Sequence, residues 1–126
     1  MADFHVYASS PLTGEVYVVR GDAATGALER IQTVPLGGQG LAMTQSADRR
    51  FLDVLSLASL DRHAQAYYTT LRIDPASGRL DSLGRVPAPA YMVHLSVDRT
   101  GRYLLGATQG HHRIDRPARR PADHAR

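Results

Sequence analysis

The sequence predicts an all-β protein, on the basis of three observations. Short segments of alternating apolar and polar residues recur along the chain, turn-forming residues separate them, and no stretch shows a helical period of useful length. The pattern Asp-x-Ala-(Ser/Thr)-Gly-x-Leu occurs at 22–28 and again at 74–80, a spacing of 52 residues. Because four short strands in each repeat are typical of a propeller blade, we expect an incomplete β-propeller of about two four-stranded antiparallel blades. A small sandwich or a partly open barrel would show similar strand spacing.

Each copy of the repeated pattern reads as a tight turn between two strands. Asp22 and Asp74 are expected to accept hydrogen bonds from their own turn backbone, and Gly26 and Gly78 to adopt positive φ. Alternating segments on both sides make each copy a β-hairpin. The expected strands lie at 5–9, 15–20, 28–34, 41–45, 50–55, 67–73, 80–86, 92–97 and 102–108. They form a partial blade, one complete blade and the beginning of a third.

Composition excludes several kinds of chemistry. The chain has 126 residues, 43% of them hydrophobic, which suits one small domain with a core. It has no cysteine, and its fifteen basic residues are all Arg, so disulfides, thiolate catalysis, a Walker-type loop and a Schiff-base lysine are excluded. No secretory leader and no membrane-spanning stretch is recognisable, so we expect a cytoplasmic location and no membrane association.

The net charge of +3 lies entirely in the last residues of the chain. Ten Arg balance ten acidic residues in 1–110, whereas 111–126 hold five Arg and two Asp. We divide the chain into a partial propeller domain, 1–108, and a basic, disordered tail, 109–126. The tail has few arginines and no aromatic residue, so we expect no nucleic-acid partner.

His111 and His112 are adjacent and would point to opposite faces of a strand, so we expect no metal site.

The segments "VYASSPLTGEVYVVRGDAATGALERIQTVPLGGQ", "SADRRFL", "LRIDPASGRLDSLGRVPAP" and "VHLSVDRTGRYLLGAT" resemble the amino-terminal part of the seven-bladed propeller lactonases. This family contains bacterial 6-phosphogluconolactonases and is related to carboxymuconate-lactonizing enzymes. The resemblance covers about 4–108. It implies hydrolysis of 6-phospho-D-glucono-1,5-lactone, a small sugar-phosphate lactone, in the pentose phosphate pathway without a cofactor. It also implies that the catalytic residues of the family lie in later blades, beyond this chain.

The resemblance also indicates two site residues. His94 is expected on the innermost strand of its blade, at a position where the family often has histidine, and is the candidate catalytic residue. Gln39, in the loop before an inner strand, is the candidate substrate-binding residue. The alternative for His94 is a histidine hydrogen-bonded to a neighbouring blade, and the alternative for Gln39 is an ordinary loop residue; a structural role takes precedence for both.

One position departs from the family. Asp53 stands where an aromatic residue is usual and shares a strand face with Phe51 and Leu55. Because a buried unpaired carboxylate is costly, we expect this strand to be locally exposed or to have drifted from the family pattern.

Whether the chain acts as an enzyme by itself is left open by the sequence. A propeller protects its strand edges by closing the ring, and two blades cannot do so. We therefore expect a truncated chain that is inactive alone. The alternative is a non-enzymatic β-module that binds a protein partner, or another copy of itself, through open strand edges.

Overall fold

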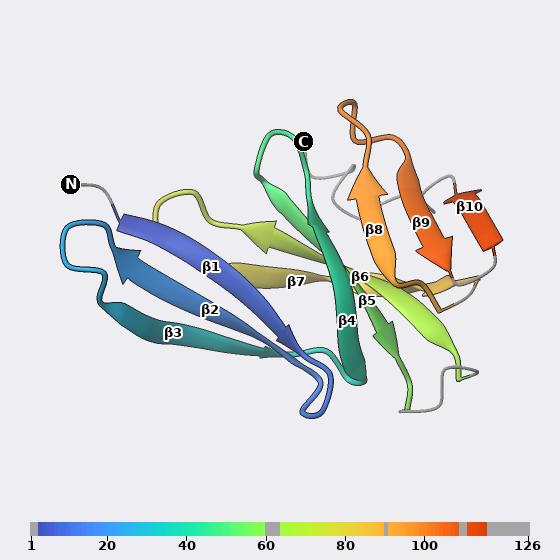
Figure 1. The fold of residues 1–126 in the computed structure, drawn as a ribbon, viewed down its shortest axis with the longest axis horizontal. Helices are drawn as coiled ribbons and strands as arrows, with labels where there is room; N and C mark the ends of the chain where they lie inside the picture. Colours follow the sequence, from blue (N-terminus) through green and yellow to red (C-terminus); the bar gives the residue numbers. More distant parts are fainter. Residues whose placement is uncertain (1–2, 60–63, 90, 109–110, 116–126) are drawn as a thin grey trace.

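The structure, a computed structural model, describes residues 3–59, 64–89, 91–108 and 111–115, and these residues form strands and turns without any helix. Ten strands make three antiparallel sheets, which lie side by side in chain order (Figure 1). The all-β prediction is therefore confirmed. The first sheet has three strands, the second has four, and the third has three.

The strand bounds follow the expected segments closely and lengthen several of them. The strands are β1 (Asp3–Ser10), β2 (Glu15–Asp22), β3 (Leu28–Pro35), β4 (Gln39–Gln45), β5 (Phe51–Leu57), β6 (Ala66–Ile73), β7 (Leu80–Ala88), β8 (His94–Val97), β9 (Leu104–Thr108) and β10 (His111–Asp115). Each sheet keeps its strands in sequence order: β1-β2-β3 in the first, β4-β5-β6-β7 in the central and β8-β9-β10 in the third.

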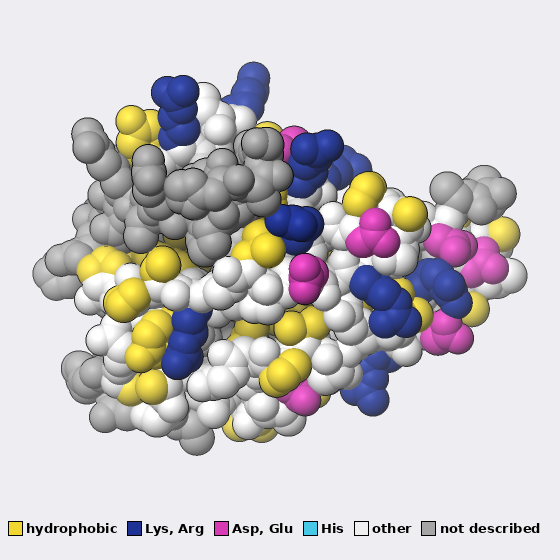
Figure 2. Space-filling view, turned by 180° about the vertical axis from the view of Figure 1, so that it is seen from behind, with side chains coloured by type: hydrophobic (Ala, Val, Ile, Leu, Met, Phe, Trp, Pro, Cys, Tyr) yellow, Lys and Arg dark blue, Asp and Glu magenta, His cyan; other side chains and the backbone are white. Residues whose placement is uncertain are grey.

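The repeated turns have the predicted chemistry. The carboxylate of Asp22 accepts a hydrogen bond from the Ala24 N–H at 2.8 Å, and Asp74 accepts one from the Ser77 hydroxyl at 2.5 Å. Gly26 and Gly78 both have φ of 75°, a conformation that side chains other than glycine rarely adopt. Seen from behind, acidic and basic side chains are interspersed over the hairpin end of the first sheet, at the right of Figure 2.

The 52-residue repeat extends to an irregularity of the backbone. The register of β2 against β3 shifts between Val18 and Val19, and that of β6 against β7 shifts between Thr70 and Leu71. The two positions are 52 residues apart, so the bulge is part of the repeated unit. Equivalent residues in β2 and β6 can therefore be compared one by one.

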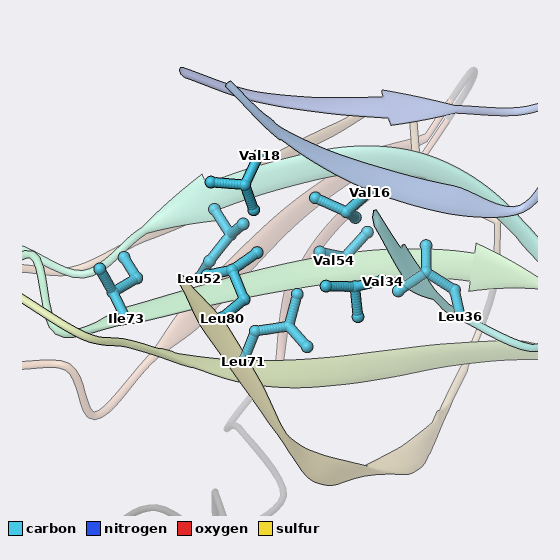
Figure 3. Packing of buried hydrophobic residues seen from close by; sticks show 9 residues of the cluster. All are labelled: Val16, Val18, Val34, Leu36, Leu52, Val54, Leu71, Ile73 and Leu80. Atoms are coloured by element: carbon cyan, nitrogen blue, oxygen red, sulfur yellow. The ribbon is translucent and has the colours of Figure 1, made fainter. Parts of the chain in front are cut away.

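The central sheet is buried on both faces because another sheet packs against each. Alternate residues of β5 point in opposite directions, so Leu52 and Val54 face the first sheet while Leu55 and Leu57 face the third. The cluster between the first and central sheets consists of Val16, Val18, Val34, Leu36, Leu52, Val54, Leu71, Ile73 and Leu80 (Figure 3). The cluster between the central and third sheets consists of Leu55, Leu57, Ala66, Tyr68, Ala88, Met92, Leu95 and Leu104.

Asp53 lies in this buried strand and corrects one expectation. Its residue is only 2% exposed, so the strand is not locally open at this point. The carboxylate Oδ1 accepts a hydrogen bond of 2.8 Å from the hydroxyl of Thr70, which stands directly opposite on β6. A cross-strand hydroxyl thus compensates part of the cost of burying the carboxylate.

The strand β10 was not among the expected elements. It pairs with β9 in antiparallel register, from His111 opposite Thr108 to Asp115 opposite Leu104. Part of the segment 109–126, expected to be a disordered tail, is therefore a strand, because pairing uses backbone groups and needs no apolar alternation. Residues 109–110 and 116–126 lie outside the described residues. Within the described chain, no helix has the length and hydropathy required to span a bilayer.

Candidate functional site

Three chain segments meet closely at the end of the molecule where β4 begins. The N–H of Leu36 donates a hydrogen bond of 2.8 Å to the carbonyl of Gly14, joining the β3–β4 loop to the β1–β2 turn. A Cβ on Gly14 would collide with the carbonyl of Gly38, and one on Gly38 would collide with that of Leu57. This packing therefore requires glycine at both positions. We call this end of the molecule, residues 10–14 and 36–40, the rim.

Gln39 is the first residue of β4 and stands opposite Leu57 of β5. Directly opposed residues share a face, and Leu57 belongs to the cluster between the central and third sheets, so Gln39 points to that side. The Gln39 side chain is half-buried, and its Oε1 is buried with no hydrogen-bond partner among the described residues. An acceptor left without a donor in this way is a position where a ligand hydroxyl or a water molecule would be stabilised.

His94 is the first residue of β8, which is the edge strand of the third sheet and lies against β4. Its neighbour Leu95 is buried in the cluster shared with the central sheet. Since successive side chains alternate, His94 points to the other face of its sheet, where it is exposed. It stands opposite Ala107 of β9.

The two predicted site residues lie on neighbouring strands, but they are neither at the same level nor facing each other. β4 and β8 run side by side in the same direction, and β8 begins beside the middle of β4 and not beside Gln39 (Figure 1). Gln39 lies on the side of β8 that faces the central sheet, whereas His94 lies on the side that faces away. The two side chains are therefore separated both along the strands and by the side to which they point.

Arg85 is a charged group near the rim that the sequence did not indicate. Its guanidinium lies over the ring of Tyr67, 3.9 Å from the centroid, and beside Gly37 of the β3–β4 loop. Stacking on an aromatic ring holds a guanidinium in a defined orientation. Nothing in the repeat could have marked this residue, because the position 52 residues earlier is Thr33.

The described residues offer no obvious metal site. No three His, Asp or Glu side chains among them are grouped as metal ligands would be. A cleft of about 400 Å³ lies at the opposite end of the molecule from the rim, lined in part by Asp3, His5, Arg20 and Arg79. Its mixed charges, with Arg20 already paired to Glu29 at 2.5 Å, select neither an anion nor a cation.

Comparison with known proteins assigns the chain to a family. The sequence profile of the family described as "Lactonase, 7-bladed beta-propeller" matches residues 5–118. The chain belongs to this family. The match continues past Thr108 and includes β10, so this lactonase-family chain keeps the family pattern further than the sequence alone indicated.

The relatives of this lactonase-family chain include proteins named 6-phosphogluconolactonase. That of Serratia proteamaculans is 35% identical over 103 residues, and that of Enterobacter sp. is 31% identical over 103 residues. Each alignment covers 82% of this chain and 29% of the relative. The chain therefore spans less than a third of the length of these relatives.

Solved structures agree on the fold. A candidate 6-phosphogluconolactonase from Bacteroides uniformis has a TM-score of 0.70 at 21% identity, over 87% of this chain and 32% of that one. The periplasmic gluconolactonase of Pseudomonas aeruginosa has a TM-score of 0.66 at 23% identity, over 90% of this chain and 34% of that one. The three sheets of this lactonase-family chain are therefore blades of a propeller, and they make up part of one.

Proposed function

We propose that this chain contributes part of the site of a lactonase that hydrolyses 6-phospho-D-glucono-1,5-lactone to 6-phosphogluconate, a step of the pentose phosphate pathway. The observation that carries the proposal is family membership together with 31–35% identity to proteins named 6-phosphogluconolactonase. The parts of the site in question are the rim, which holds Gln39, and the beginning of β8, which holds His94. No cofactor is required by this chemistry.

Hydrolysis of a lactone makes definite demands on a protein. Water attacks the ring carbonyl carbon, a general base takes the proton of that water, and hydrogen-bond donors stabilise the oxyanion that forms. The ring oxygen then leaves carbon 1, takes a proton and becomes a hydroxyl. A phosphate group on the substrate calls in addition for cationic donors, for which the forked guanidinium of arginine is well suited.

The two candidate residues are assigned roles in this scheme. Gln39 binds a sugar hydroxyl, because its buried Oε1 accepts a hydrogen bond that no described residue supplies. His94 is the candidate general base, since an exposed imidazole at the beginning of an inner strand is open to water and substrate. Their separation means that further groups are needed before the two act on one substrate.

We therefore expect that the 126-residue chain by itself does not raise the rate of lactone hydrolysis above the spontaneous rate. The measurement is acid release from freshly prepared 6-phosphogluconolactone, with and without purified protein. Turnover clearly above the background, abolished by His94→Ala, would show that this chain holds a complete catalytic set and that the expectation of missing groups is wrong.

Binding of the product provides a test that does not depend on turnover. Titration with 6-phosphogluconate, followed by NMR of the side-chain amide of Gln39, is expected to give saturable shifts. Gln39→Leu is expected to weaken binding roughly tenfold, as the loss of one buried hydrogen bond predicts. Gln45→Leu, at the exposed opposite end of β4, is the matched control and should bind normally. Equal effects of both variants, or no saturable shift at all, would contradict the assignment of Gln39.

The substrate class can be tested in the same way. Gluconate, which lacks the phosphate, is expected to bind more weakly than 6-phosphogluconate.

A cytoplasmic location belongs to the same proposal, since phosphorylated sugars of this pathway are made inside the cell, although one structural relative is named as periplasmic. Fractionation of the producing cells would decide the location.

A further inference from the structure

The first sheet carries apolar side chains on the face that turns away from the central sheet. Phe4 is 42% exposed, Val6 43% and Leu28 65%, although the opposite face of the same sheet buries Val16 and Val18 completely. Tyr17 and Val19 of β2 point to the same outer side, because they alternate with the buried valines. An apolar face of this kind is typical of a surface that packs against another sheet.

The repeat shows what this outer face corresponds to. Leu28 is equivalent to Leu80, which is 5% exposed, and Val19 is equivalent to Leu71, which is fully buried. Both Leu71 and Leu80 belong to the face of the central sheet that packs on the first sheet. The outer face of the first sheet is thus equivalent to the face of the central sheet that packs against a neighbouring blade.

The third sheet presents the complementary half of such a contact. Leu104 and Leu95 face the central sheet, so Leu105 and Ala107 of β9 point outward and are half-buried. His94 and Ser96 of β8 point to the same side and are exposed. Ala107 is equivalent to Leu55, a fully buried residue on the face of the central sheet that packs against the third. The outer face of the third sheet therefore corresponds to a surface that, one repeat earlier, receives the next blade.

We propose that two copies of this chain associate head to tail, with the outer face of the third sheet of one copy packed on the outer face of the first sheet of the next. The same blade-to-blade contact occurs twice within the chain, and among the described residues the equivalent outer faces of the first and third sheets make no such contact. This contact buries sheet faces, in contrast to pairing through strand edges. Because the two halves are different surfaces, the contact is heterologous and can propagate to further copies.

The proposal goes beyond the lactonase function and does not depend on it. Sedimentation velocity of the 126-residue chain over a wide range of concentrations is expected to show a series of species that grows with concentration. Leu28→Asp is expected to lower the association constant at least about tenfold, since it places a charge in an apolar contact. Leu12→Asp, in the β1–β2 turn and 81% exposed, is the control and should associate as the unmodified chain does.

A mixing experiment distinguishes the head-to-tail contact from other arrangements. Ser96→Arg, at an exposed position, blocks the third sheet, while Leu28→Asp blocks the first. Each variant alone should be monomeric, and an equimolar mixture should form a dimer of one copy of each, because one intact half remains on each chain. Circular dichroism of each variant confirms that it is folded.

Three outcomes overturn the proposal. The unmodified chain stays monomeric at all concentrations, as it would if only other blades of a ring or a different protein covered these faces. Ser96→Arg alone still dimerises, which would mean that the first sheet packs on its own copy. The mixture of the two variants stays monomeric although each is folded.

Discussion

Leu28 and Leu80 close the same seven-residue motif, yet one is 65% exposed and the other 5%. The turns that precede them have the same glycine conformation and similar Asp-centred hydrogen bonds. The two leucines differ in whether another sheet packs on them. Gln32 of β3 accepts a hydrogen bond from the Leu80 N–H at 2.7 Å and donates one to its carbonyl at 2.8 Å, which fixes this part of β7 to the first sheet. The local sequence therefore specifies the hairpin, whereas contact with a neighbouring sheet determines whether the leucine that follows the turn is buried.

Truncating the two leucines should separate these two contributions. Leu80→Ala is expected to lower the free energy of unfolding by about 2–5 kcal/mol, as for other buried leucines, because it opens a cavity between the first and central sheets. Leu28→Ala is expected to change it by less than about 0.5 kcal/mol under conditions where the chain is monomeric. Urea unfolding followed by circular dichroism measures both. Equal losses from the two variants would mean that the motif itself, independent of packing, carries the stability.

Thr69 and Thr70 provide a sharper comparison, between the two faces of the central sheet. Both are 5% exposed, but the Thr70 hydroxyl donates to Asp53, whereas the Thr69 hydroxyl has no partner among the described residues. Thr70→Val should cost about 1–3 kcal/mol of unfolding free energy, since it removes a donor from a buried carboxylate. Thr69→Val should be neutral or slightly stabilising. Urea unfolding of the two variants gives the difference, and a larger loss for Thr69→Val would refute this view of the two faces.

The smallest expected effect is the response of the turns to acid. Hydrogen bonds lower the pKa of all three turn carboxylates below 3.8: chiefly from the Ala24 N–H to Asp22, from the Ser77 hydroxyl to Asp74, and from the Thr100 hydroxyl to Asp98. A lowered folded-state pKa contributes stability that is present above the unfolded value and is lost as the pH falls through the folded value. The melting temperature should therefore drop as the pH falls below about 4.

Replacing the three residues gives the control for this acid response. A chain with Asp22→Asn, Asp74→Asn and Asp98→Asn keeps side chains that can accept from the turn backbone but that do not titrate. Its melting temperature should depend less on pH in the same range. Asp22→Asn and Asp74→Asn, tested singly, should have similar effects despite the different burial of the leucines that follow them. An unchanged pH dependence in the triple variant would exclude the turns as its source.

Hairpins, repeat and blade order could be predicted because they depend on local chemistry. Asp and Gly at fixed positions specify a turn wherever they occur, and alternating residues specify a strand with one or two covered faces. The strand β10 lacks such a pattern, since "HHRID" has one large apolar residue, and it forms through backbone pairing with β9. The burial of Asp53 could not be predicted for a related reason. Its hydrogen-bond partner Thr70 is 17 residues away in the sequence, and only the register of β5 against β6 brings the two side chains together.

The strands that carry the two candidate residues could be predicted, but the directions of their side chains could not. The glycines around Gln39 indicate a loop, but the structure begins β4 at Gln39 and shifts its register against β5 between Gly40 and Met43. A bulge reverses the alternation of side chains that follow it, so the side to which a residue points cannot be counted from the sequence. For His94, the side depends on Leu95 being the residue that enters the core. The place of Arg85 depends on contacts with Tyr67 and Gly37 that no repeat marks.

The burial of β5 along its whole length has a consequence for how the molecule comes apart. Its even-numbered apolar residues belong to one cluster and its odd-numbered leucines to the other, while β4 and β6 pair with both of its edges. Neither outer sheet can detach without wetting one entire face of this strand. Loss of either neighbour thus weakens the other contact as well. We therefore expect the three sheets to unfold as one cooperative unit and the β5 amides to be the last to exchange their hydrogens with solvent.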